Sequence, residues 1–122
     1  MIDTYNFQTP RNIFEKLQRD SNRLDKVMDG DYMFNFISTA YHLQEWIKKS
    51  PVKSSVAVKR FVKRLNQDEN LKICGEILSA SKHFMVSPVE EGCQLNVDGV
   101  CVDAEKFKKD IMELYDVFFK LK

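Results

Sequence analysis

The sequence has few residues that cross-link or interrupt a fold: four glycines, three prolines and three cysteines among 122 residues. Its cysteines, Cys74, Cys93 and Cys101, are odd in number, and their spacing matches neither a disulfide framework nor a zinc motif. We therefore expect reduced thiols and a cytoplasmic protein. Cys74 falls among apolar residues with helical spacing, which indicates a buried, structural thiol.

Long apolar runs and an excess of one charge are also missing. No stretch approaches the roughly 20 apolar residues that a helix needs to cross a bilayer, and the N-terminus lacks the features of a signal peptide. Nineteen basic and eighteen acidic residues leave a net charge of +1. We expect no membrane partner, and the chain as a whole has no charge excess that would attract a polyanion.

Apolar residues make up 43% and charged residues 30% of the chain, which is typical of one globular domain, here residues 1–122. Apolar positions recur with a period near 3.6 in five segments and predict five helices. The first begins at Thr9-Pro10, a capping residue followed by a proline at the first helical position. It ends at Asp29-Gly30-Asp31, where Gly30 suits a left-handed C-cap and Asp31 caps the next helix.

Segment 32–49 is the most apolar of the five, which predicts a central helix packed on several sides. Ser50-Pro51 ends it, because proline disfavours helical geometry in the preceding residue. A third helix follows. The fourth is expected from Asp68 to about His83-Phe84, and Asp103 caps the last one.

Asp98-Gly99 is a strong signal for a two-residue hairpin turn, whereas Ser87-Pro88 predicts an ordinary turn. The hairpin aligns two apolar pairs: Val97 with Val100, and Leu95 with Val102. Cys101 falls on the opposite face. Because a lone hairpin is only marginally stable, its apolar face is expected to lie on the helices. The sequence thus predicts a mainly α, single-domain bundle of about five helices with a small β-hairpin near residues 94–103.

The two histidines are the first catalytic candidates. His42 and Glu45 are three positions apart on the predicted central helix, so Glu45 could orient the imidazole as a general base. His83 follows Lys82 at the end of the predicted fourth helix, where the helix dipole favours a cation. Surface or helix-end placement explains all four residues without catalysis. The two histidines match no metal-ligand motif, and no glycine-rich loop indicates a cofactor, so we expect neither metal nor cofactor.

Positions 48 to 64 contain seven basic residues and no acidic one. Four of them share one face of the predicted third helix: Lys59, Arg60, Lys63 and Arg64. The other three are Lys48, Lys49 and Lys53. Such a face is the usual electrostatic means of binding nucleic-acid phosphates. A short amphipathic helix also needs a solvated face, so both interpretations remain open.

The chain carries two short motifs, Tyr41-His42-Leu43-Gln44-Glu45-Trp46 and, later, Cys74, Ile77 and Lys82-His83-Phe84. They resemble Tyr/Trp-His-Leu-x-Asp-Trp and Cys-Arg-Asp-hydrophobic-Ala-Asn-Gly-x-Lys-His-Phe, motifs of a group of small bacterial proteins of unknown function. The similarity runs from about Thr9 to Phe84, roughly 60% of the chain. It departs at Gly75-Glu76, which replace Arg-Asp, and at Ser79-Ala80, which replace Asn-Gly. The resemblance implies a helical bacterial protein associated with phage defence or a mobile element, and no established activity.

The helices that carry the histidines bear a weaker similarity to the HEPN helical bundles, many of which are metal-independent RNA-cleaving proteins. The HEPN signature is an arginine, four to six residues, and then a histidine. The corresponding positions hold Asn35-Phe36-Ile37 before His42 and Glu76-Ile77-Leu78 before His83. Because none of these is arginine, the signature is not met.

Three functions follow as expectations. The first is a non-catalytic binding or accessory module, and the second is a HEPN-like RNA-cleaving enzyme that uses His42 or His83. The third is a nucleic-acid binder without catalysis, through the face between Lys48 and Arg64. A protein partner or homodimer is also expected, because the adjacent rings of Phe118 and Phe119 cannot both face one core.

Overall fold

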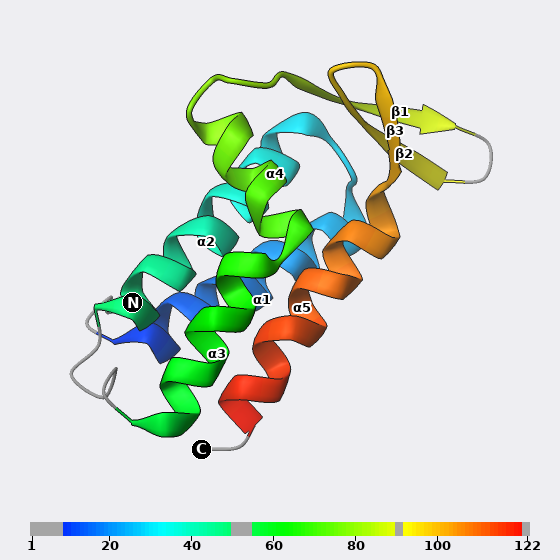
Figure 1. The fold of residues 1–122 in the computed structure, drawn as a ribbon. Helices are drawn as coiled ribbons and strands as arrows, with labels where there is room; N and C mark the ends of the chain where they lie inside the picture. Colours follow the sequence, from blue (N-terminus) through cyan, green and yellow to red (C-terminus); the bar gives the residue numbers. More distant parts are fainter. Residues whose placement is uncertain (1–8, 50–54, 90–91, 121–122) are drawn as a thin grey trace.

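A computed structural model of the chain describes residues 9–49, 55–89 and 92–120. These residues contain five helices: α1 (Pro10–Lys26), α2 (Gly30–Lys48), α3 (Val56–Gln67), α4 (Glu69–Leu78) and α5 (Ala104–Lys120). Three strands lie between α4 and α5: β1 (Phe84–Val89), β2 (Gly92–Val97) and β3 (Val100–Asp103). Figure 1 shows the helices as a bundle with the small sheet at one end. The prediction of a mainly helical bundle with a small β-element is confirmed.

Three helix starts follow from capping residues that are visible in the sequence. Thr9 caps α1 in a capping box, in which its hydroxyl accepts a hydrogen bond from the Asn12 backbone N–H. The Asn12 side chain in turn accepts a hydrogen bond from the Thr9 backbone N–H. Asp68 caps α4 by accepting a hydrogen bond from the Leu71 N–H. Asp103 accepts a hydrogen bond from the Lys106 N–H in the same way at the start of α5.

The boundary between α1 and α2 differs from the prediction. Asp29, not Asp31, caps α2, and its carboxylate accepts the Tyr32 N–H at 2.8 Å. Gly30 is therefore the first residue of α2 rather than a left-handed C-cap of α1. The reason is that Val27 leaves α1 in an extended conformation, so that no left-handed residue is needed to end the helix.

The central position predicted for the second helix is confirmed. α2 packs against α1, α3, α4 and β1. It buries apolar residues on several sides, namely Met33, Phe36, Ile37, Ala40, Leu43 and Ile47. His42 and Glu45 lie on the part of α2 that remains accessible to solvent. The helix that holds the core therefore also carries two of the candidate residues.

The hairpin has the predicted register, with Val97 paired to Val100 and Leu95 to Val102, and Gly99 takes the left-handed conformation of the turn (φ +86°). The sequence analysis missed β1, which pairs with β2 and makes the sheet three-stranded, in the order β1-β2-β3. Ser87-Pro88 lies within β1 instead of forming a turn. β1 is an edge strand, where a proline without an N–H is tolerated.

The sheet is fastened to the bundle by its apolar face. Leu95 and Val97 are buried, and the ring of Phe84 stacks on Phe34 of α2 with the centroids 6.4 Å apart. Cys101 is exposed on the other face, as predicted. The sheet therefore contacts α2 near the N-terminal end of that helix.

α4 ends at Leu78, not near His83-Phe84 as predicted. Ala80 has a positive φ of 62°, and the backbone N–H groups of Ser81 and Lys82 donate to the Glu76 carbonyl. This left-handed turn gives hydrogen bonds to a carbonyl group in the last turn of α4, and the chain then turns into β1.

The adjacent rings near the C-terminus both pack on the bundle. Phe119 is buried and stacks on Phe14 of α1, with centroids 4.4 Å apart. Phe118 is half-buried and stacks on Phe61 of α3 at the same centroid distance. The two rings diverge as expected, but each of them meets a different helix. Neither ring is therefore a reason to expect a dimer.

Tyr115 is fully buried, and its hydroxyl donates a hydrogen bond to the Ala40 carbonyl at 2.7 Å. We expect Tyr115→Phe to lower the free energy of unfolding by about 1 kcal/mol at pH 7, because this bond joins α5 to α2. Urea denaturation checks the value.

Burial raises the pKa of Tyr115 well above 10.0, its ordinary value. The neutral hydroxyl therefore contributes fully below about pH 10, and its contribution is lost as the pH rises toward the folded-state pKa. Above about pH 10 the wild type should lose stability more steeply than Tyr115→Phe. Parallel pH profiles of the two proteins would contradict this assignment.

Gly75 lets α4 approach α2 closely. A Cβ at this position would lie 2.6 Å from Cε1 of Tyr41, closer than real Cβ atoms come to carbon. Position 75 therefore has no room for the arginine that the bacterial motif carries there.

We expect Gly75→Ala to destabilise the protein by about 1 kcal/mol, because the clash with the Tyr41 ring outweighs alanine's better helix propensity. In a Tyr41→Ala background the same substitution should stabilise by about 1 kcal/mol, since only the propensity remains. Chemical denaturation of the four proteins measures this change of sign. A stabilising effect in both backgrounds would show that the ring can move aside.

Candidate functional site

The basic residues of α3 occupy one exposed face. Ser55 caps the helix by accepting the Val58 N–H at 3.1 Å. Val58, Phe61 and Leu65 are buried against the bundle. The opposite side carries the four predicted basic residues, all of them exposed: Lys59, Arg60, Lys63 and Arg64. We call these four residues the α3 basic face.

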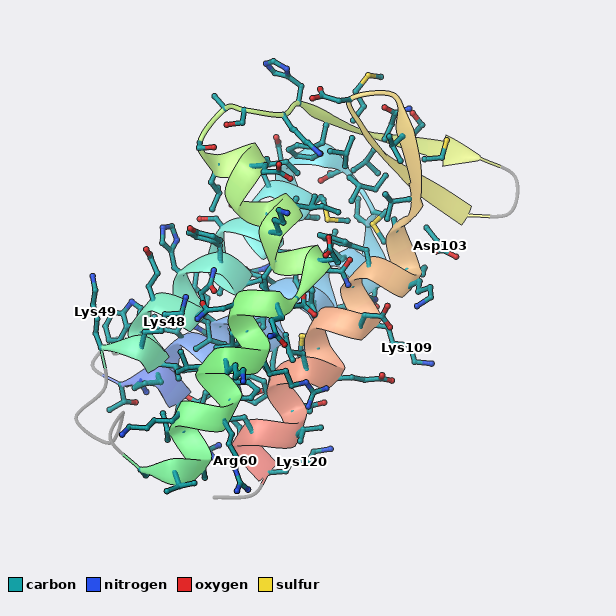
Figure 2. All side chains as sticks on the ribbon, viewed as in Figure 1. Lys48, Lys49, Arg60, Asp103, Lys109 and Lys120 are labelled. Carbon is teal, nitrogen blue, oxygen red and sulfur yellow. The ribbon has the colours of Figure 1, made fainter. Side chains whose placement is uncertain are left out.

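None of the four cations forms an ion pair with any residue in the described ranges. Figure 2 shows Arg60 and Lys120 at the lower end of the bundle, and Lys48 and Lys49 at its left edge, all of them away from the sheet. Lys53 of the predicted cluster lies outside the described residues. The labelled basic residues thus lie on the part of the bundle away from the sheet, although the net charge of the whole chain is only +1.

His42 lies on the exposed side of α2, and 53% of its side chain is accessible. Its Nδ1 is 3.3 Å from the Ser38 hydroxyl, and its Nε2 is 4.0 Å from Oε1 of Glu45. His42 and Glu45 are neighbours on α2 as predicted, but the distance of 4.0 Å between Nε2 and Oε1 is too long for a hydrogen bond. Glu45 therefore does not orient the imidazole in this conformation.

His83 is almost fully solvated, with 90% of its side chain exposed. Its backbone N–H donates to Asp98 in the hairpin turn, and its Nδ1 lies 3.8 Å from the same carboxylate. The neighbouring Lys82 pairs with Glu76 at 3.4 Å. His83 thus follows α4 instead of ending it, and its exposed position belongs to the turn region beside the sheet.

The structure gives the two histidines different neighbours. Phe84, next to His83, stacks on Phe34, which precedes His42 by eight residues. Eight residues correspond to about 12 Å along a helix axis. His42 contacts residues of α2, whereas His83 contacts Asp98. The four catalytic candidates are therefore divided between two places.

The sequence analysis missed a groove of 480 Å³ between α1 and α2. Its lining comes from both helices: Ile13, Lys16, Phe34, Asn35, Ser38, Thr39, His42 and Trp46. One signal for it was present, since positions 34, 38, 42 and 46 recur at intervals of four and form one ridge of a helix. That α1 forms the other wall depends on tertiary packing. His42 is thus part of a groove rather than of an isolated surface.

A buried carboxylate lies beside this groove. The side chain of Asp20 in α1 is inaccessible to solvent, and it accepts hydrogen bonds from Lys16 at 2.8 Å and Arg23 at 3.1 Å. The hydroxyl of Thr39 in α2 donates to it at 2.6 Å. This network joins α1 to α2 and holds the Lys16 ammonium at the edge of the groove.

A second buried charge ties α5 to the end of α1. Lys108 is buried, and its ammonium contacts Asp25 and lies 3.3 Å from Glu105. Burial lowers the pKa of Lys108, but the bonds to Asp25 and Glu105 outweigh this effect and raise it. The ammonium therefore stays charged and serves the packing of the bundle.

The remaining chemistry-bearing groups do not form a further site. Cys74 and Cys101 are free thiols, and burial strongly raises the pKa of Cys74, which makes it a poor nucleophile. The side chain of Cys93 is outside the described part. Among the described residues, no group of three His, Cys, Asp or Glu side chains is arranged to hold a metal ion. None of the described helices is long and apolar enough to cross a membrane.

Among the residues that the structure describes, the α3 basic face and the α1–α2 groove are two features that can meet a ligand. The first offers exposed positive charge, and the second offers rings and hydrogen-bonding groups in a concave surface. Comparison of the chain with protein-family models, with curated proteins and with solved structures finds no match.

Proposed function

We propose that this chain is a non-catalytic binding module that holds nucleic acid through the α3 basic face. The observation that carries the proposal is the set of four exposed cations on one helix that have no ion-pair partner among the described residues. Lysine and arginine that only solubilise a helix are commonly interspersed with acidic residues. α3 has no acidic residue.

Phosphate binding is the natural use of such a face. Cations spaced one helical turn apart can neutralise successive phosphates and release their condensed counterions, which supplies most of non-specific binding free energy. Arg60 and Arg64 can in addition bind phosphate oxygens through two parallel N–H groups. Lys48 and Lys49 add two cations at the C-terminal end of α2, also away from the sheet.

The catalytic alternative has less support. Cleavage of RNA by a HEPN-like route needs an imidazole and a cation acting on one phosphodiester. Lys82, the cation next to His83, is paired with Glu76, and the carboxylate nearest to His42 is 4.0 Å away. Among the described residues neither imidazole has a carboxylate at hydrogen-bonding distance, and the partner of His42 Nδ1 is the neutral Ser38 hydroxyl.

Incubation of labelled RNA with the purified protein tests both alternatives at once. We expect a mobility shift at low salt, while denaturing gels show the RNA at full length. A His42→Ala/His83→Ala double variant serves as the control for cleavage, and its denaturing gels should also show the RNA at full length. Cleavage by the wild type that the double variant loses would replace the binding proposal by the enzyme.

Other expectations from the sequence accompany this proposal and remain predictions. They are a bacterial origin, a cytoplasmic location, a role beside phage defence or a mobile element, and association with a protein partner or a second copy. The proposal does not depend on any of them.

A further inference from the structure

We propose that the α1–α2 groove is the part of the interface that receives bases, so that the ligand is a single strand rather than a duplex. This inference rests on the proposed function and adds the class of nucleic acid to it. In this arrangement the phosphates follow the cations at the end of α2 and on α3, while unstacked bases enter the groove.

The groove presents ring faces in a row. Phe34, His42 and Trp46 belong to the ridge of α2 that forms one wall. Trp46 follows His42 by one helical turn, about 6 Å along the axis. The side chain of His42 is 53% exposed, and Phe34 is 45% exposed although Phe84 stacks on its ring, so both rings are partly accessible. Stacking on such rings is the usual way in which proteins hold bases of any sequence.

Between these rings the groove offers hydrogen-bonding groups. Lys16 has three N–H donors, of which Asp20 and Thr39 accept one each. No acceptor for the third is found among the described residues, so it can bind a phosphate or a base oxygen, and the Lys16 side chain is 36% exposed. Asn35 and Ser38 also line the groove and can both donate to and accept from a base edge. The combination of a cation, polar groups and rings suits a nucleotide better than a purely apolar peptide.

The groove leads toward the basic end of the molecule. Trp46 lines it two residues before Lys48, and Lys49 lies on the same flank of α2 as Trp46. Figure 2 shows Lys48 and Lys49 at the C-terminal end of α2, at the left edge of the bundle and away from the sheet. A strand whose bases occupy the groove therefore meets lysines where it leaves it.

A duplex cannot use this groove in the same way. Its bases are paired and stacked on each other, and their faces are closed to aromatic side chains. Recognition of a duplex by this chain would rest on phosphates alone. The structure thus predicts tighter binding of single strands than of duplexes at equal length and salt.

Trp46 is the only tryptophan in the chain and reports directly on the groove. The test compares a 12-nucleotide oligo(U) RNA, about the length that such surfaces hold, with a duplex of the same length. We expect the single strand to quench Trp46 emission saturably, with a midpoint that matches binding by anisotropy, and the duplex to leave the emission unchanged.

His42→Ala should weaken binding of the single strand at least about fivefold, because one stacked base is lost, without changing its salt dependence. His83→Ala, the matched control, should leave affinity unchanged. Equal binding of both RNAs with silent Trp46 emission would overturn the groove assignment and leave the proposed function intact. Failure of both RNAs to bind at low salt would overturn the two together.

Discussion

Replacement of Lys59 and Lys63 by glutamate should lower the affinity for single-stranded RNA at least about tenfold at low salt. The two lysines lie one turn apart on α3, are exposed, and form no ion pair with a described residue. Their loss removes two phosphate contacts, and the new carboxylates repel the strand. The slope of log affinity against log salt should also become shallower by about one for each lysine. Fluorescence anisotropy measures both quantities.

The matched control for this double reversal is Lys106→Glu/Lys109→Glu. Both residues are exposed on α5 and the substitution changes the net charge by the same amount. Figure 2 shows Lys109 at the right edge of the bundle, beside α5, and Arg60 at its lower end. If position matters, only the α3 variant loses affinity. Equal losses in the two variants would mean that net charge alone, and not the α3 basic face, governs binding.

Removal of the Asp20 carboxylate should have the largest effect on stability. Asp20→Ala is expected to lower the free energy of unfolding by about 3 kcal/mol, because a buried acceptor of three hydrogen bonds is lost between α1 and α2. The loss is not larger because Lys16 and Arg23 are partly exposed and can be hydrated. Thr39 keeps the Asn35 carbonyl, at 2.9 Å, as an acceptor.

Asp110→Ala provides a control with the same local chemistry. Lys106 and Asp110 form an ion pair at spacing i, i+4, as Lys16 and Asp20 do, but in solvent. Solvent screens an exposed helix pair, so we expect a much smaller loss than for Asp20→Ala. Urea denaturation of both variants measures the difference. Similar losses would indicate that Asp20 contributes only as a helix-surface charge.

The parts of the fold that depend on local chemistry could be predicted from the sequence. The capping residue Thr9, the cap Asp68 and the turn Asp98-Gly99 lie where they were expected, because their effect needs only neighbouring backbone groups. β1 could not be found in this way. Its pairing with β2 is set by the sheet, and the sequence signal at Ser87-Pro88 indicated a turn.

The same distinction between local chemistry and tertiary packing applies to the candidate site. The α3 basic face was predictable, since four cations share the exposed side of one amphipathic helix. The groove was not, because Lys16 of α1 meets Thr39 and His42 of α2 only after the helices pack. Phe118 shows the same limitation: that its ring rests on Phe61 depends on where α3 lies.

The dependence of wild-type affinity on salt tests the central claim most directly. Anisotropy titrations of single-stranded RNA at several sodium chloride concentrations give the number of phosphates that the protein neutralises. Four cations of α3 that each contact one phosphate predict a slope of about −3 in log affinity against log salt. A slope near zero would mean that the α3 basic face does not bind phosphate, and would contradict the account.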